Sequence, residues 1–111
     1  MEIDEQVKVV TWCELHGIPV FHIVNEGKRT PWSGRQLVAA GLRRGVPDLC
    51  IPQARGGYHA LYIEMKYGKN KLTEDQKYWL RLLKAEGNAT YVAYSFEEAK
   101  EAIKTYLQQG V

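Results

Sequence analysis

Apolar residues recur at helical spacing near both ends of the chain. Close to the N-terminus, four of them lie three or four positions apart: Ile3, Val7, Val10 and Cys13. This spacing predicts an amphipathic helix over residues 3–16, which Gly17 would end. A second stripe with similar spacing comprises Ala99, Ile103, Tyr106 and Leu107. It predicts another amphipathic helix near the C-terminus.

Two polar signals predict where helices begin. Thr73 with Gln76, and Ser95 with Glu98, each fit a capping box, in which residues three positions apart satisfy each other's backbone N–H groups. The first box opens a helix that Gly87 ends. We expect three apolar side chains of this helix to face the core: Trp79, Leu82 and Leu83.

β-branched and aromatic residues dominate several shorter runs. These runs predict four strands, over residues 20–24, 48–51, 58–67 and 89–94. Residues 53–57 contain two glycines and predict a hairpin connection, and residues 36–42 predict a short helix. The main elements are therefore expected in the order helix, three strands, helix, strand, helix, within one domain over residues 1–111.

Composition narrows the class of protein. Of the 111 residues, 45% are hydrophobic and 25% charged, which excludes disordered and fibrous classes. No window approaches eighteen uninterrupted apolar residues, and acidic residues stand where a secretory signal needs positive charge. We therefore expect a cytoplasmic protein with no membrane span. Cys13 and Cys50 are then expected as buried thiols, and no ligand spacing typical of zinc is present.

Charge is distributed unevenly along the chain. Residues 28–81 hold eleven of the fifteen Lys and Arg but only four of the thirteen Asp and Glu, so their net charge is +7. The remaining residues carry −5. This asymmetry favours a basic face for a polyanion, because Lys and Arg that neutralise phosphates release counterions. A solvated basic surface is the alternative.

The predicted strand over residues 58–67 carries charge on one face. Its period of two directs Ile63 and Met65 to the core and Glu64 and Lys66 to the opposite face. Asp48 begins the neighbouring strand, where its carboxylate can lie beside that of Glu64. Two nearby carboxylates repel each other unless a proton or a cation lies between them, and their oxygens suit Mg²⁺ or Mn²⁺. Such a centre can hydrolyse phosphodiesters; a plain Glu64–Lys66 ion pair is the alternative.

The chain resembles the VRR-NUC nuclease domain of the PD-(D/E)XK superfamily. The motif lies in residues 45–49 (Gly-Val-Pro-Asp-Leu), residues 64–66 (Glu-Met-Lys) and Gln76, and the resemblance covers nearly the whole chain. It implies an α/β, restriction-endonuclease-like core with a mixed central β-sheet flanked by helices. Small stand-alone members are typically encoded by phages or prophages, which would place this protein in the cytoplasm of a bacterial host. The family includes Holliday-junction resolvase-like enzymes.

Residue roles follow from the same resemblance. It implies that Asp48 and Glu64 are metal ligands, that the backbone carbonyl of Met65 is a third protein ligand, and that Lys66 is the catalytic lysine. Gln76 resembles the polar residue that the family presents from the next helix. Its capping role is a complete alternative, and the two roles are compatible.

Two further candidates come from the N-terminal part of the chain. The family uses a glutamate of the first helix, for which Glu2 is favoured and Glu5 and Glu14 are alternatives. His22 either touches the site or is a satisfied core histidine.

We expect a divalent-metal-dependent endonuclease that acts on branched DNA and recognises phosphate geometry and DNA shape. A non-catalytic nucleic-acid-binding module and a sequence-specific restriction-type endonuclease are the rivals. Seven basic residues are expected to contact DNA: Lys28, Arg29, Arg35, Arg43, Arg44, Lys69 and Lys71.

A homodimer is also expected. A four-way junction offers two equivalent strands, which a two-fold dimer would match with two sites. Seven aromatic residues could supply the interface or fill the core: Trp12, Trp32, Tyr67, Tyr78, Trp79, Tyr94 and Tyr106.

Overall fold

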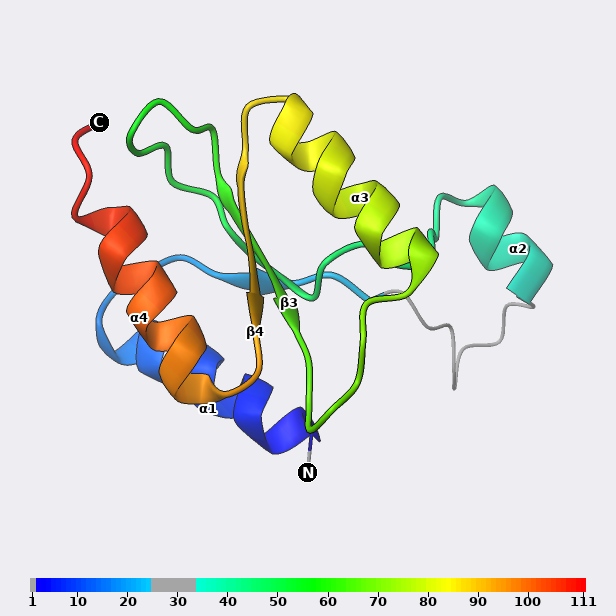
Figure 1. Ribbon diagram of the computed structural model, residues 1–111, viewed down its shortest axis with the longest axis horizontal. Helices are drawn as coiled ribbons and strands as arrows, with labels where there is room; N and C mark the ends of the chain where they lie inside the picture. The colour runs from blue at the N-terminus through cyan, green and yellow to red at the C-terminus, as the bar shows by residue number, and fades with distance from the viewer. Residues whose placement is uncertain (1, 25–33) are drawn as a thin grey trace.

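The computed structural model describes residues 2–24 and 34–111, apart from the side chains of residues 2 and 3. Helices and strands alternate along the chain except where β3 follows β2 directly (Figure 1). The elements are α1 (Glu2–Leu15), β1 (Phe21–His22), α2 (Gly34–Ala39), β2 (Leu49–Ile51), β3 (Leu61–Met65), α3 (Glu74–Ala85), β4 (Ala89–Ala93) and α4 (Phe96–Leu107). The predicted order of elements is confirmed.

A mixed sheet forms the centre of the molecule, with strand order β1-β2-β3-β4. β1 pairs with β2 and β2 with β3 in antiparallel fashion, whereas β3 and β4 are parallel and α3 connects them. The mixed sheet with flanking helices agrees with the expected architecture. Leu49 pairs with Ile63 across β2 and β3, and this register brings the start of β2 alongside the end of β3.

The predicted strand over residues 58–67 is too long at both ends. Before β3, Arg55 and Tyr58 form an isolated bridge around Gly56 and Gly57. Both glycines have positive φ, at 56° and 87°, as the tight two-residue turns of hairpins require. The predicted hairpin connection is therefore confirmed, but the chain between this turn and β3 leaves the ladder.

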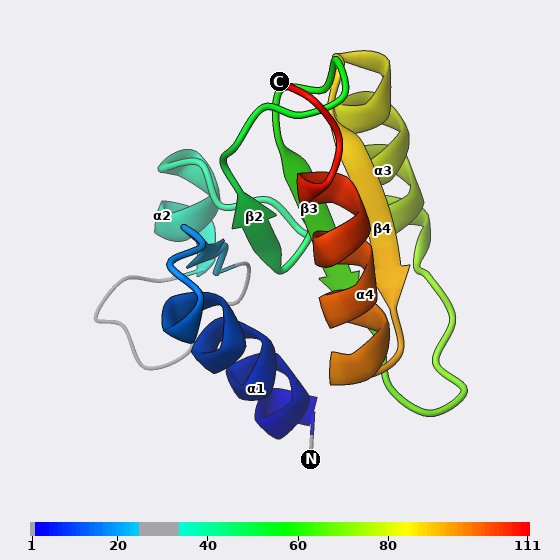
Figure 2. The same ribbon diagram turned by 90° about the vertical axis from the view of Figure 1, so that its left-hand side faces the viewer.

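Helices cover the two faces of the sheet differently (Figure 2). α1 and α4 pack over the face that holds the main core, to which the buried residues of β2, β3, β4, α1 and α4 contribute. In α4, Ala99, Ile103 and Tyr106 are buried as predicted. α3 lies on the opposite face and, within its described residues, none is buried. Its apolar side chains Trp79, Leu82 and Leu83, predicted to face the core, are only half-buried.

The buried stripe of α1 differs from the predicted one. Val9 and Cys13 are fully buried, whereas Val7 is 52% exposed. Val9 and Cys13 pack in the core between α1, α4 and the sheet. Glu5 lies on the same side of the helix, four positions before Val9, and its Oε1 accepts a hydrogen bond from the backbone N–H of Phe96 at 3.0 Å, which ties α1 to α4.

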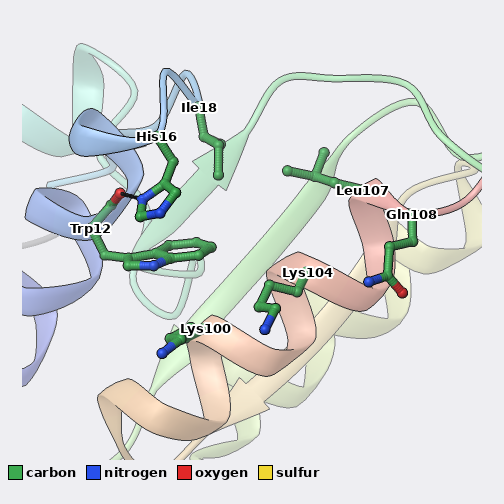
Figure 3. Close-up of a pocket in the computed structure, with 7 residues that line it drawn as sticks. All are labelled: Trp12, His16, Ile18, Lys100, Lys104, Leu107 and Gln108. Atoms are coloured by element: carbon green, nitrogen blue, oxygen red, sulfur yellow. Dashed lines mark hydrogen bonds between the residues drawn. The ribbon is translucent and has the colours of Figure 1, made fainter.

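α1 and α4 diverge from this contact and enclose a pocket between their C-terminal halves (Figure 3). Its volume is about 470 Å³. Trp12 and His16 line one side, with ring centroids 4.8 Å apart, and Lys100 and Lys104 line the other. None of the candidate site residues lines this pocket.

Two other predictions concern thiols and membranes. Cys13 and Cys50 are free and buried, as expected. Within the described ranges, no helix is long and apolar enough to cross a membrane.

Candidate active site

Asp48 is held in place from three directions. It follows Pro47, which is fully buried, and leads directly into β2. Its backbone carbonyl accepts hydrogen bonds from the N–H of Ile23 at 2.7 Å and from Nδ1 of His22 at 2.8 Å. Its carboxylate oxygen Oδ2 accepts a third from the N–H of Met65 at 2.8 Å. Both the backbone and the side chain of Asp48 are therefore fixed relative to β1 and β3.

β3 carries the other two charged residues of the motif. Glu64 is 3% exposed and Lys66 is 8% exposed, which is rare for either residue type. Ile63 and Met65 alternate with them and pack in the main core, so the strand period directs Glu64 and Lys66 to the face covered by α3. Just beyond β3, Lys66 donates its backbone N–H to the carbonyl of Ala93, which extends the pairing with β4 by one residue.

Gln76 connects α3 to this charged face. Thr73 and Gln76 form the predicted capping box: Oγ1 of Thr73 accepts from the N–H of Gln76 at 3.1 Å, and Oε1 of Gln76 accepts from the N–H of Thr73 at 2.9 Å. The amide nitrogen of Gln76 also donates to Oε2 of Glu64 at 3.2 Å. The capping role and the contact with Glu64 therefore coexist.

One carboxylate oxygen of Glu64 is left over. Oε1 is buried and has no hydrogen-bond partner among the described residues. An unsatisfied buried acceptor is costly, and such an atom is explained by local strain, by a catalytic role, or by a bound water or ion. Oε1 of Glu64 is therefore available to a proton or to a cation.

The two carboxyl groups perturb each other. Burial, followed by the negative charge of Asp48, raises the pKa of Glu64 to about 8, although the nearby Lys66 ammonium opposes this. Burial also raises the pKa of Asp48, opposed first by the hydrogen bond from Met65. Both shifts mean that the site resists holding two negative charges without a compensating cation.

The loop before Asp48 contacts α3 closely. Gly45 has φ of +87°, and a Cβ on it would lie 2.5 Å from the backbone carbon of Asp75 and 2.7 Å from the backbone nitrogen of Gln76. Only glycine permits both this backbone conformation and this approach. The loop that delivers Asp48 is therefore packed against the helical turn that delivers Gln76.

His22 belongs with the site and is not a core histidine. It is exposed, its Nδ1 contacts the carbonyl of Asp48, and the amide of Gln6 lies 3.2 Å from the same ring nitrogen. Burial raises the pKa of Asp48, and the nearby imidazole of His22 is among the groups that oppose this rise. Sequence alone left two interpretations open, because a single histidine in a short strand has no spacing partner.

The three candidate glutamates of the first helix have different surroundings. The side chain of Glu2 lies outside the described part of the structure. Both oxygens of Glu5 have other partners: Oε1 accepts from Phe96, and Oε2 pairs with the ammonium of Lys8 at 2.9 Å. Glu14 is exposed. Glu5 therefore has a structural contact at the start of α4 and is a poor alternative to Glu2.

The basic residues predicted to contact DNA also differ in environment. Lys28 and Arg29 lie outside the described residues. Arg43 donates from one guanidinium nitrogen to the carbonyls of Val38 and Leu42 at 2.7 and 2.9 Å, so it is engaged at the C-terminal end of α2. Arg43 is nevertheless exposed, as are the remaining four: Arg35, Arg44, Lys69 and Lys71.

The residues present suit a hydrated divalent cation. Two carboxylates, one with an unpartnered oxygen, match the few protein ligands with which Mg²⁺ is usually bound while it keeps several waters. A larger all-protein cage is absent: across the described ranges, no group of three or more His, Cys, Asp and Glu could hold a metal ion.

Comparison with known proteins agrees with this arrangement. The sequence model of the VRR-NUC domain family matches residues 2–97, a range that contains the whole site. A solved structure described as "VRR_NUC domain protein" is 28% identical to this chain, with a TM-score of 0.83, and the match covers 98% of this chain and 89% of that one. The sequence matches none of the curated proteins with which it was compared. The restriction-endonuclease-like fold class is thereby confirmed.

Proposed function

The chain belongs to the VRR-NUC domain family, a nuclease-type domain, and from that membership we propose that it is a divalent-metal-dependent DNA endonuclease. We propose further that it hydrolyses phosphodiester bonds in branched DNA, in the manner of a Holliday-junction resolvase. The observation that carries the proposal is the buried Oε1 of Glu64, which has no partner among the described residues although it lies in a site with a second carboxylate and a buried lysine. This free oxygen, beside a second carboxylate and a lysine, supports a cation site over a plain ion pair.

Asp48 and Glu64 are the proposed protein ligands of Mg²⁺ or Mn²⁺, with the backbone carbonyl of Met65 as a third. The chemistry that such a cation supplies is polarisation of a phosphoryl oxygen and a lowered pKa of a bound water. Met65 contributes in a second way, because its N–H holds Oδ2 of Asp48 at 2.8 Å. The side chains are thus oriented by backbone donors before any substrate arrives.

Lys66 is the proposed catalytic lysine. Its ammonium is near enough to lower the pKa of both Asp48 and Glu64. A positive charge at this position would stabilise the negative charge that grows on the phosphate in the transition state and would orient the attacking water. Its burial strengthens this effect, since water screens a buried charge less.

Exposed basic side chains support the choice of DNA as the substrate. Arg44 lies in the loop before Asp48, and Lys69 and Lys71 lie in the loop between Lys66 and α3. These positions flank the proposed centre along the chain, so phosphate contacts there would bring a backbone to the site. Such contacts carry no base-specific information, which favours recognition of DNA shape.

We also propose that the protein acts as a homodimer, because two sites related by a two-fold axis match the two equivalent strands of a junction. Among the aromatic residues considered for the interface, Tyr106 is buried in the core, so it is withdrawn. Trp12 and Tyr67 pack partly against the core. Tyr78 and Tyr94 are 53% and 41% exposed and are the better candidates.

One assay tests the proposed function. A labelled four-way junction, a flap, a splayed arm and plain duplex are each incubated with the protein, with and without Mg²⁺ and Mn²⁺. We expect metal-dependent cleavage of branched substrates, loss of cleavage in Glu64→Gln, and no loss in Glu101→Gln, an exposed control on α4. Binding without cleavage would support the non-catalytic module, and cutting of plain duplex at a fixed sequence would support the restriction-type enzyme.

A further inference from the structure

We propose that Thr73 is a positioning residue for Glu64, acting through the side-chain amide of Gln76. The inference rests on the proposed function in one respect, the assignment of Glu64 as a cation ligand. Thr73 itself is exposed, and the hydrogen bonds found for it are with Gln76 and the first turn of α3. Its influence would therefore be indirect.

The amide of Gln76 has two different ends, and the backbone N–H of residue 73 sets which end faces Glu64. The Thr73 hydroxyl acts one step earlier: it accepts from the N–H of Gln76 and so holds residue 73 in the capping conformation from which its own N–H reaches Oε1. Oε1 of Gln76 is taken by the N–H of Thr73 at 2.9 Å, so the NH₂ group points to Oε2 of Glu64 at 3.2 Å. Were the amide reversed, its oxygen would face a carboxylate and repel it. The capping box therefore fixes the donor direction as well as the helix end.

This single hydrogen bond also decides how the carboxylate of Glu64 is turned. Oε2 is satisfied by Gln76, whereas Oε1 is buried without a partner among the described residues. The two oxygens of a carboxylate are equivalent, so a half-turn would change nothing, but any intermediate rotation would break the hydrogen bond from Gln76. This bond therefore holds the plane of the carboxylate, with one oxygen on Gln76 and the other available to a cation.

The first turn of α3 cannot move closer to the loop that carries Asp48. Gly45 packs against the backbone of Asp75 and Gln76 so closely that even a methyl group would not fit. The cap at Thr73 and the contact at Gly45 together position the turn, while Asp48 follows Gly45 by three residues. A change in the cap should therefore be felt at the carboxylates.

α4 provides a matched control for the loss of a helix cap. Ser95 is its N-cap, and its hydroxyl accepts from the N–H of Glu98 at 3.1 Å, as the Thr73 hydroxyl does from Gln76. Removing either hydroxyl removes one N-cap hydrogen bond, so the two substitutions should lower stability by similar amounts. Only Thr73→Ala should also loosen a donor to Glu64.

The experiment compares Thr73→Ala, Thr73→Ser and Ser95→Ala with the natural protein by titration calorimetry with Mn²⁺ alone, below the thermal transition of each variant. We expect Thr73→Ala to bind Mn²⁺ about tenfold more weakly, in the range of measured outer-sphere effects, and Thr73→Ser to restore the affinity. Ser95→Ala should lower thermal stability similarly without changing the affinity. Equal weakening by both alanine variants, or unchanged affinity in Thr73→Ala, would overturn the proposal.

A metal-free measurement separates this proposal from the proposed function. In NMR spectra without metal, the side-chain NH₂ signals of Gln76 should lose the signature of a fixed hydrogen bond in Thr73→Ala and keep it in Thr73→Ser and Ser95→Ala. If the natural protein bound no Mn²⁺, the proposed metal site would be refuted. These metal-free spectra would still test whether Thr73 positions Gln76. Unaltered Gln76 signals in Thr73→Ala would refute the positioning role itself.

Discussion

Oδ2 of Asp48 accepts a hydrogen bond from the backbone N–H of Met65 at 2.8 Å. The two residues are 17 positions apart, and the bond ties the start of β2 to the strand segment that carries Glu64 and Lys66. Because Met65 is anchored in the main core, the position of the Asp48 carboxylate is set by the packing of the fold.

Replacing any member of this charged group should abolish cleavage. For Asp48→Asn, Glu64→Gln and Lys66→Met we expect rates at least about a hundredfold lower, because each removes metal-binding charge or transition-state stabilisation. Methionine keeps most of the apolar part of the lysine side chain, so Lys66→Met should retain the fold. Single-turnover cleavage and DNA binding measured together test this, and near-normal cleavage by Lys66→Met would show that the site is assigned wrongly.

The metal-free protein should lose stability as the pH rises. The pKa of Glu64 is raised from 4.5 to about 8 by burial and by Asp48, so between these values the folded protein holds a proton that the unfolded chain has released. Stability is therefore greatest below pH 4.5 for this group and is lost toward pH 8, by roughly 2 to 4 kcal/mol.

Urea unfolding at several pH values checks this expectation. The decrease of the unfolding free energy with pH should be smaller in Glu64→Gln, because glutamine does not titrate between pH 4.5 and 8. Mg²⁺ should stabilise the natural protein more at pH 8 than at pH 5.5, because it competes with the proton for the carboxylates. A pH slope identical in the natural protein and in Glu64→Gln would remove Glu64 as its source.

Gly45→Ala should be more harmful than Gly57→Ala, although both glycines have φ of +87°. Alanine in this conformation costs about 1 to 2 kcal/mol at either position. A Cβ at residue 57 would meet nothing within 4 Å, whereas one at residue 45 would collide with the backbone of α3. We expect about 1 to 3 kcal/mol of additional loss at Gly45, together with slower cleavage. Equal losses in the two variants, measured by denaturant unfolding, would show that the close approach is unimportant.

Binding of branched DNA should weaken steeply with salt. Each phosphate contact contributes about 0.9 to the slope of log K against log salt for duplex arms. We expect Arg44→Gln, and separately Lys69→Gln with Lys71→Gln, to reduce this slope, and Lys104→Gln on α4 to leave it unchanged. Arg43 is unsuitable for the comparison because its guanidinium is bound to carbonyls of Val38 and Leu42. An unchanged slope in all variants would exclude these loops from the interface.

Light scattering coupled to size exclusion tests the homodimer. The chain has a mass of 12.7 kDa, and we expect about twice that mass at micromolar concentration. Tyr78→Ser and Tyr94→Ser should shift the mass toward the monomer if these exposed rings lie in the interface. A monomer that persists after junction DNA is added would refute both the dimer and the paired cuts.

Periodicity predicted the elements well, but not which side of each helix would be buried. The spacing of Ala99, Ile103 and Tyr106 was sufficient for α4, because its apolar stripe is narrow and complete. In α1, the sequence offered several apolar positions at similar spacing. Packing against α4 and the sheet buried Val9 and Cys13 and left Val7 half exposed, with Glu5 on the buried side bound to the N–H of Phe96, 91 residues away.

The sequence by itself determined the α/β order of elements, the capping box of α3, the N-cap of α4 and the family, and it proposed Asp48, Glu64, Lys66 and Gln76 for the site. These properties depend on the spacing of residues close together in the sequence, so they can be read before the tertiary structure is known. The second predicted capping box is only half formed, because the carboxylate of Glu98 accepts from the N–H of Tyr94 and not from that of Ser95. Only the tertiary structure decided that Gln76 donates to Glu64, that Oε1 of Glu64 is left without a partner among the described residues, and that His22 and Gly45 contact the site's supports. Burial and hydrogen bonding between distant segments arise from packing, so no local pattern specifies them.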